Sequence, residues 1–156
     1  MPLVIEEAER PEQFEAGAGL FKEYAAFLGF DLEFQNFSDE LENLQSMYGP
    51  PHGFLLLAKM DNTYVGCVAL RPIAPGTGEM KRLYVLKPYQ GKGIGKALTE
   101  AFLARAAGLA YRAVRLDSVA RLGSALRLYK DCGFNEIAPY CFNPYPDAVF
   151  LEYRIS

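Results

Sequence analysis

The sequence predicts one α/β domain, spanning residues 1–156, with a mixed, largely antiparallel sheet flanked by helices. Its 156 residues, 51% of them hydrophobic and 22% charged, suit a single globular unit with one substantial core. Strand-like and helix-like runs follow one another in the order β-α-α-β-β-β-α-β-α-β-β. The sequence contains no internal repeat, linker or low-complexity tract that would divide it.

The first half combines strands with two helices. Residues 3–6 are expected to form a short strand. A helix is expected from Pro11, a favoured first helical residue, to near Gly29, because apolar residues recur there at helical spacing. Residues 39–47 predict a second helix, and residues 53–72 predict a hairpin with its turn at Asp61-Asn62.

The second half alternates strands and helices. Residues 72–78 are rich in proline and glycine and predict a loop before a strand at 79–86. The remaining elements are expected to be a helix at 94–108, a strand at 113–117, a helix at 122–132, and strands at 134–137 and 148–155.

The stretch Gln90-Gly-Lys-Gly-Ile-Gly-Lys96 lies between a predicted strand and a predicted helix. Its three glycines let the backbone turn sharply and expose N–H groups without side-chain obstruction. The helix start adds unpaired N–H groups and the positive end of the helix dipole. Together these features predict a cradle for a phosphate or pyrophosphate group.

Two well-known phosphate-binding motifs fit this stretch poorly. A P-loop has one more residue before its lysine, and Ala97 stands where its magnesium-binding Ser or Thr would be. A dinucleotide-binding fingerprint needs Gly-x-Gly-x-x-Gly, whereas the glycines here are Gly91, Gly93 and Gly95. Asp117 could imitate the ribose-binding acid of such proteins, so a nucleotide-dependent oxidoreductase stays open as an alternative.

The same stretch matches Gln/Arg-x-x-Gly-x-Gly/Ala, the signature of the GNAT superfamily of N-acetyltransferases. Leu83-Tyr-Val-x-x-Pro88 resembles that family's fourth strand, and Ala125-x-x-Leu-Tyr-x-x-x-Gly-Phe134 resembles its fourth helix and the following turn. The resemblance covers residues 79–137, with the pieces in family order. Leu122 departs from the pattern, because many members carry there an Asn that helps to hold the cofactor.

The resemblance implies that acetyl-CoA is the acyl donor and that the fourth and fifth strands splay apart to admit its pantetheine arm. It also implies a backbone N–H near Leu83 as the donor to the oxyanion. The residues expected to bind the cofactor are Leu83, Tyr84, Val85, Gln90, Gly91, Lys92, Gly93, Ile94, Gly95 and Lys96.

Direct transfer of an acetyl group to an amine needs a proton acceptor and a proton donor, but no enzyme nucleophile. The resemblance implies Tyr129 as the donor to the leaving thiolate, and a phenol is protonated at neutral pH. Glu79 is expected to be the proton acceptor, directly or through a water, with its pKa raised by burial. Glu33, His52 and Asp117 are alternatives to Glu79, and Tyr129 could instead be a core aromatic residue.

The two halves of the chain carry opposite charge. Residues 1–79 hold 4 Lys/Arg and 13 Asp/Glu, whereas residues 80–156 hold 12 and 6. The basic half contains the predicted cradle and suits a polyanionic cofactor, so the acidic half predicts a small, cationic acceptor. The loop 140–146, rich in aromatic residues and proline, is expected to form a wall of the acceptor pocket, a plug over the core or a homodimer contact.

Several other classes of function are not expected. A net charge of −3 argues against a nucleic-acid partner, and one histidine with three irregularly spaced cysteines argues against a metal site or disulfide framework. Apolar runs too short for a bilayer and an acidic N-terminus predict a cytoplasmic protein without a membrane partner. The leading function is an acetyl-CoA-dependent N-acetyltransferase acting on a small amine. The alternative is a non-catalytic acyl-CoA sensor on the same scaffold.

Overall fold

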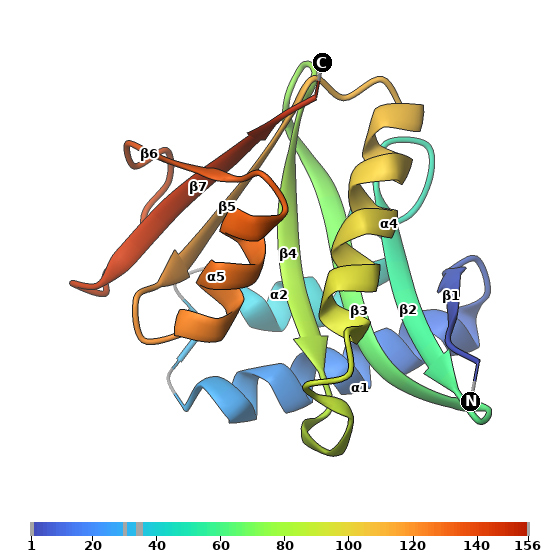
Figure 1. Cartoon of the computed structure of the whole chain (residues 1–156). Coiled ribbons are helices and arrows are strands. Elements are labelled where there is room, and N and C mark those ends of the chain that lie inside the picture. Colours follow the sequence, from blue (N-terminus) through green and yellow to red (C-terminus); the bar gives the residue numbers. More distant parts are fainter. Residues whose placement is uncertain (1, 30, 34–35, 156) are drawn as a thin grey trace.

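The computed structural model describes residues 2–29, 31–33 and 36–155. Its strands are β1 (Val4–Glu7), β2 (Phe54–Met60), β3 (Thr63–Ala74), β4 (Thr77–Val85), β5 (Ala113–Val119), β6 (Asn135–Ile137) and β7 (Ala148–Arg154). Its helices are α1 (Pro11–Leu28), α2 (Phe37–Glu42), α3 (Leu44–Met47), the 3₁₀ turn η2 (Lys87–Tyr89), α4 (Ile94–Gly108) and α5 (Gly123–Asp131). The strands form one seven-stranded sheet in the order β1-β2-β3-β4-β5-β7-β6 (Figure 1).

The sheet is mixed and largely antiparallel, as the sequence predicts. Each neighbouring pair runs antiparallel except β4 and β5, which are parallel and connected through α4. Parallel pairing of neighbouring strands requires a crossover connection of this kind. Among the described residues, no helix is both long enough and apolar enough to cross a membrane.

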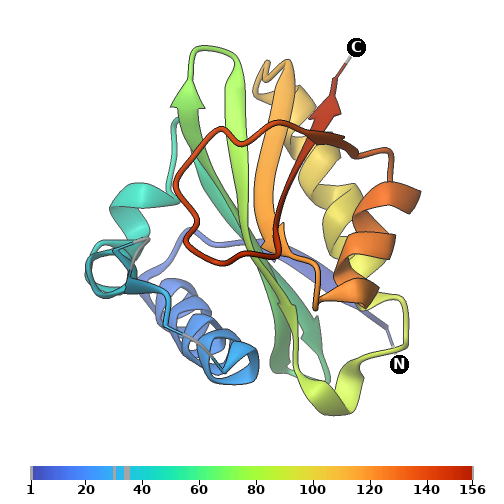
Figure 2. The same cartoon turned by 90° about the vertical axis from the view of Figure 1, so that its left-hand side faces the viewer.

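Helices cover both faces of the sheet (Figure 2). Successive side chains of a strand point to opposite faces, so β2 supplies two cores at once. Leu55 and Leu57 pack with Phe21 and the rest of the α1 face, whereas Phe54 and Leu56 belong to the core under α4 and α5. The buried cores therefore hold the sheet between α1 to α3 on one side and α4 with α5 on the other.

Helix α1 begins and ends at the expected residues. Pro11 occupies the first turn, where its missing N–H costs nothing, and the Gln13 side chain accepts hydrogen bonds from the Glu9 and Arg10 N–H groups at 2.8 and 2.9 Å. Gly29 ends the helix in the left-handed conformation, with φ of 71°.

Two local predictions were wrong. The predicted loop at 72–78 is a tight connection, because β3 continues to Ala74 and β4 begins at Thr77, and these two residues pair. Prolines at an exposed strand end do not prevent pairing, although they lower the strand signal. The helix expected at 39–47 is divided into α2 and α3 at Asn43, which has non-helical backbone angles.

Strands β4 and β5 pair over only three residues. Their register runs from Thr77 opposite Ala113 to Glu79 opposite Arg115. Beyond this point β4 continues to Val85 and β5 to Val119, but the two strands no longer pair with each other, so they diverge. The predicted splay between the fourth and fifth strands is confirmed.

A bulge interrupts β4 within the splayed part. The β3–β4 register passes from Lys81 to Tyr84, and Arg82 has a positive φ of 62°. A bulge adds a residue to one strand and redirects the side chains on either side of it. Arg82 therefore reaches the same face of the sheet as Lys81, where α2 lies, rather than the opposite face.

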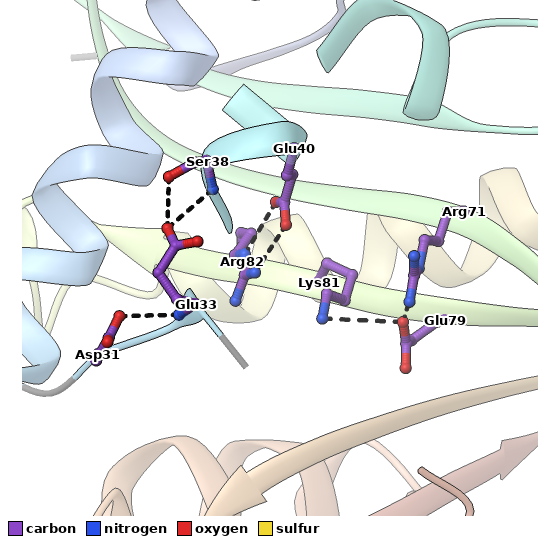
Figure 3. A network of polar contacts seen from close by, with 8 residues as sticks. All are labelled: Asp31, Glu33, Ser38, Glu40, Arg71, Glu79, Lys81 and Arg82. Atoms are coloured by element: carbon purple, nitrogen blue, oxygen red, sulfur yellow. Dashed lines mark hydrogen bonds and ion pairs between the residues drawn. The ribbon is translucent and has the colours of Figure 1, made fainter. Parts of the chain in front are cut away.

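The redirected Arg82 forms an ion pair with Glu40 of α2 (Figure 3). The guanidinium Nε and terminal nitrogen lie 3.0 and 2.7 Å from the two Glu40 carboxylate oxygens. Both side chains are at least 96% buried. This bidentate geometry compensates the cost of removing two charges from water and fixes α2 against β4.

We predict that Arg82→Met lowers the free energy of unfolding by about 3–5 kcal/mol, because it leaves the Glu40 carboxylate buried without its partner. Urea unfolding measures the loss. The double variant Glu40→Leu/Arg82→Met should recover much of it. As a control, Arg105→Met removes the more exposed pair with Glu7 and should cost no more than about 1 kcal/mol. An Arg82→Met loss equal to that of the control would contradict the prediction.

Candidate functional site

A groove of about 560 Å³ lies where β4 and β5 diverge. Its volume falls in the range of about 300–1,000 Å³ that is typical of small-molecule sites. Strand β4, the loop before α4, the link between β5 and α5, and the end of α1 all contribute. The lining residues are Tyr24, Phe27, Leu83, Tyr84, Val85, Tyr89, Gln90, Gly91, Gly93, Ile94, Gly95, Lys96, Arg121, Leu122, Gly123, Ser124, Ala125, Leu128 and Tyr129.

Nine of the ten residues predicted to bind the cofactor line this groove; Lys92 is exposed and does not. Gln90 also shapes the loop, because its side-chain Nε2 donates a hydrogen bond to the Val85 carbonyl at 2.8 Å. This contact fastens the glycine-rich loop to the end of β4. The loop therefore starts from a fixed position at the mouth of the groove.

The glycine-rich loop leads into α4 through Gly93, whose φ of 83° lies in the left-handed region that favours glycine. The Ala97 N–H bonds to the Gly93 carbonyl at 3.0 Å, which closes the first turn. The N–H groups before it, in Ile94, Gly95 and Lys96, precede the hydrogen-bonded part of the helix. All three residues line the groove, so the positive end of α4 is available to an anion.

Arg121 brings a further positive charge to the groove. Its guanidinium lies 2.8 Å from an Asp147 carboxylate oxygen and 5.4 Å from the centre of the Tyr145 ring. Sequence reasoning missed Arg121, because it belongs to no motif and only the chain path after β5 brings it to the groove. Arg121 and Lys96 both line the groove, and their positive charge suits a phosphate group.

A narrow inner cavity of about 40 Å³ adjoins the groove. Tyr24, Leu83, Leu122 and Tyr129 line both spaces, so they form the boundary between them. The polar or charged residues that line only the inner cavity are Lys81, Arg82, Asp117, Ser118 and Asn143. The groove and the inner cavity therefore meet at a boundary where two tyrosines, Tyr24 and Tyr129, lie.

Tyr129 of α5 is buried, and burial raises the pKa of its phenol above the ordinary value of 10.0. It therefore stays protonated at neutral pH and can donate a proton or a hydrogen bond. Its ring also packs against Phe134, with centroids 5.7 Å apart. Tyr129 is thus a packing residue that also carries a protonated phenol at the boundary, and its role as proton donor stays a prediction.

Tyr24 is a boundary residue that sequence reasoning assigned only to the apolar face of α1. Its ring packs against the Tyr84 ring, with centroids 5.7 Å apart. Burial raises the pKa of Tyr24 to about 12. The helical spacing of Tyr24 is that of a core residue, so the sequence carries no signal that separates the two roles.

Glu79 lies in β4 with only 2% of its surface exposed, and it lines neither the groove nor the inner cavity. Arg71 Nε lies 2.9 Å and Lys81 Nζ 3.9 Å from its Oε1 (Figure 3), and the Tyr140 hydroxyl donates to its Oε2 at 2.8 Å. Both carboxylate oxygens thus have partners.

The prediction that burial raises the pKa of Glu79 was wrong. Burial alone would raise it, but the charges of Lys81 and Arg71 and the hydrogen bonds from Tyr140 and Arg71 outweigh this effect. The pKa of Glu79 lies below its ordinary value, so the group is a carboxylate at neutral pH.

The three alternatives to Glu79 lie in different places. Glu33 is exposed and accepts hydrogen bonds from the Ser38 N–H and hydroxyl. His52 lines two other cavities, next to Pro72. Asp117 of β5 lines the inner cavity together with Tyr129.

Among the described residues, no acid from the acidic half of the chain lines the inner cavity. Its charged lining residues, among those described, are Lys81, Arg82 and Asp117, and all of them belong to the basic half of the chain. The charge difference between the two halves of the chain therefore does not appear in the lining of this cavity, and the cationic acceptor stays a prediction. The loop 140–146 does contribute to its wall, through Asn143.

Comparison with known proteins agrees with this geometry. A family model described as the acetyltransferase (GNAT) family matches residues 18–134. An uncharacterized N-acetyltransferase of Schizosaccharomyces pombe is 39% identical over 97% of this chain and 94% of that protein. An IAA acetyltransferase of Azospirillum brasilense is 35% identical over 97% of this chain and 98% of that protein.

A solved structure shows the same fold. The PaiA N-acetyltransferase of Thermoplasma acidophilum, in complex with coenzyme A, has a TM-score of 0.76 with 20% identity. The similarity covers 99% of this chain and 100% of that chain.

We predict that Glu79→Gln destabilises the protein at neutral pH and much less in acid. Because the folded pKa of Glu79 lies below its ordinary 4.5, the carboxylate contributes stability above that value. This contribution is lost as the pH falls through the folded pKa. The difference in unfolding free energy between parent and variant should be largest near pH 7 and shrink below about pH 4.5. A variant more stable than the parent at pH 7 would show that burial governs this group.

Proposed function

Because the chain belongs to the acetyltransferase (GNAT) family, we propose that it transfers an acetyl group from acetyl-CoA directly to the amine of a small acceptor. One observation carries this proposal. Tyr129 lies at the boundary between the groove, with its helix start and basic residues, and the inner cavity. A donor held in the groove and an amine held in the inner cavity would meet at this residue.

The groove fits acetyl-CoA in both shape and charge. The α4 N–H groups, Lys96 and Arg121 would hold the pyrophosphate, and the β4 segment from Leu83 to Val85 would lie along the pantetheine arm. The coenzyme A bound by the PaiA enzyme supports acetyl-CoA as the donor. Acetyl-CoA supplies a thioester whose acyl carbon accepts the amine nitrogen.

Two groups of the chain would assist the transfer. Tyr129 would donate its phenolic proton to the departing sulfur, and its raised pKa keeps that proton in place until the thiolate forms. The backbone N–H of Leu83 would stabilise the charge on the acyl oxygen. Leu83 lies beside the bulge, outside the β3–β4 register, and lines both the groove and the inner cavity.

The contacts of Glu79 favour a structural role over its predicted role as proton acceptor. Its two oxygens are bonded to Arg71 and Tyr140, and it does not line the inner cavity. We propose instead that Glu79 supports the site by holding Tyr140, and so the loop that contributes Asn143 to the cavity wall.

Release of free thiol from acetyl-CoA, measured against a broad panel of small amines, tests the proposed function. Turnover with at least one primary amine is the expected result. Binding of acetyl-CoA without thiol release throughout the panel would favour the sensor, and stabilisation by NAD rather than acetyl-CoA would favour the oxidoreductase.

We predict that Gly93→Asp abolishes the thermal stabilisation given by coenzyme A, because it places a carboxylate at the phosphate cradle. Gly93→Asn is the matched variant, since Asn tolerates a positive φ and has the same shape without the charge. The Asn variant should keep most of the stabilisation. Equal shifts in the two variants would place the phosphates elsewhere. Melting temperatures without ligand control for the fold.

We predict that Tyr129→Phe lowers kcat on the order of 10²–10⁴-fold and leaves coenzyme A affinity nearly unchanged, because it removes only the proton donor. Steady-state kinetics and the thermal shift measure the two effects. Tyr153→Phe is the control, since Tyr153 contacts the Phe134 ring but lines neither the groove nor the inner cavity. A Tyr129→Phe variant within about twofold of that control would leave Tyr129 as a packing residue.

A further inference from the structure

We propose that Asp117 receives the ammonium group of the acceptor in the inner cavity and takes its proton, and that Asn143 positions Asp117 for this role. The inference rests on the proposed function and deepens it, since it assigns the proton acceptor and the kind of amine that fits. Three observations support it: the place of Asp117 in the splay, its contact with Asn143, and the size of the cavity.

Asp117 stands where β5 has left β4. The last paired residues are Glu79 and Arg115, and Asp117 is the next residue of β5 on the same face as Arg115. On its other side β5 remains paired, with Asp117 opposite Phe150 of β7, so the backbone is held. The splay thus exposes the Asp117 side chain to the inner cavity while the sheet keeps its backbone in place.

The carboxylates around the splay have distinct roles. Glu40 is bound to Arg82 through both oxygens, and Glu79 is bound to Arg71 and Tyr140. An oxygen of Glu79 and an oxygen of Asp117 lie within 4.8 Å of each other, yet only Asp117 lines the inner cavity. Within the part of the chain that the structure describes, Asp117 is the carboxylate placed to meet an amine beside Tyr129.

Asn143 holds the Asp117 carboxylate. Its Nδ2 donates to Asp117 Oδ2 at 3.1 Å, and its own Oδ1 accepts the Tyr145 N–H at 3.1 Å. Two further hydrogen bonds hold the loop that carries Asn143. The Tyr140 hydroxyl donates to Glu79 at 2.8 Å, and the Tyr145 hydroxyl donates to the Asp31 carbonyl at 3.1 Å. Asn143 is therefore a fixed donor that orients one oxygen of Asp117.

The size of the inner cavity limits the acceptor. About 40 Å³ has room for about three water-sized groups. This space suits a primary amine on an unbranched carbon better than a branched or tertiary amine. The rest of the acceptor would lie outside the inner cavity.

The proton and bond changes balance through the two side chains. Asp117 takes one proton from the acceptor's ammonium, which leaves a neutral amine. The nitrogen lone pair forms the bond to the acetyl carbon, the carbon–sulfur bond breaks, and Tyr129 gives its proton to the sulfur. The second proton of the nitrogen restores Tyr129, and Asp117 releases its proton to water. One proton is set free for each acetyl group transferred.

The test compares Asp117→Asn with the parent on ethylamine, which is protonated at neutral pH, and trifluoroethylamine, which is mostly neutral there. The kcat/KM for ethylamine should fall on the order of 10²–10⁴-fold, and that for trifluoroethylamine by less than about tenfold. The thermal shift with coenzyme A should be unchanged. An equal fall for both amines, or a fall within about twofold, would overturn the inference.

The role of Asn143 is tested by a double-mutant cycle. Asn143→Ala should raise the KM for ethylamine in the parent and change nothing further in the Asp117→Asn variant, because the oriented carboxylate is already gone. Glu79→Gln is the control and should affect both amines equally. Additive losses would overturn the positioning role. If the parent acetylates no amine at all, both the proposed function and this inference fail. If the parent acetylates amines and the Asp117→Asn variant does so equally well, only this inference fails.

Discussion

Pairing between strands β4 and β5 ends at Glu79 and Arg115, and the sheet is open between the remaining parts of these two strands. Backbone N–H and C=O groups left open between two strands are costly unless water or another group forms hydrogen bonds with them, so the opening must be held by the surrounding structure. Here β3 and β7 pair with the outer sides of β4 and β5, and α5 covers the gap. The groove, the inner cavity and the boundary between them, where Tyr24 and Tyr129 lie, all depend on this opening.

Buried charges set the shape of the opening. The bulge at Arg82 turns that side chain toward Glu40, and the Glu79 carboxylate contacts Arg71 and Lys81 (Figure 3). The same carboxylate accepts a hydrogen bond from Tyr140 of the C-terminal loop. These contacts attach both α2 and the C-terminal loop to the same strand, β4. Charges in this region therefore act first as structural links, and a catalytic role needs a side chain that also reaches the cavity.

Glu79 and Asp117 illustrate this distinction. Both are acids near the splay, and the sequence offers each as a proton acceptor. Glu79 has its oxygens bonded to Arg71 and Tyr140, and the charge of Lys81 together with these contacts lowers its pKa and keeps it a carboxylate. Asp117 lines the inner cavity and has Asn143 to orient it. Their roles follow from which partners surround each carboxylate, not from their distance along the chain.

The sequence by itself determined the order of strands and helices, the glycine-rich turn before α4 and the chemistry that this turn suits. These features depend on local periodicity and on single residues such as Gly93, so neighbours in the chain carry the information. The tertiary structure decided the rest. Arg121 and Tyr24 join the groove, and Glu40 meets Arg82, only because the fold brings distant segments together. Burial and pairing, which set the pKa and the reach of a side chain, are properties of that arrangement and leave no pattern in the sequence.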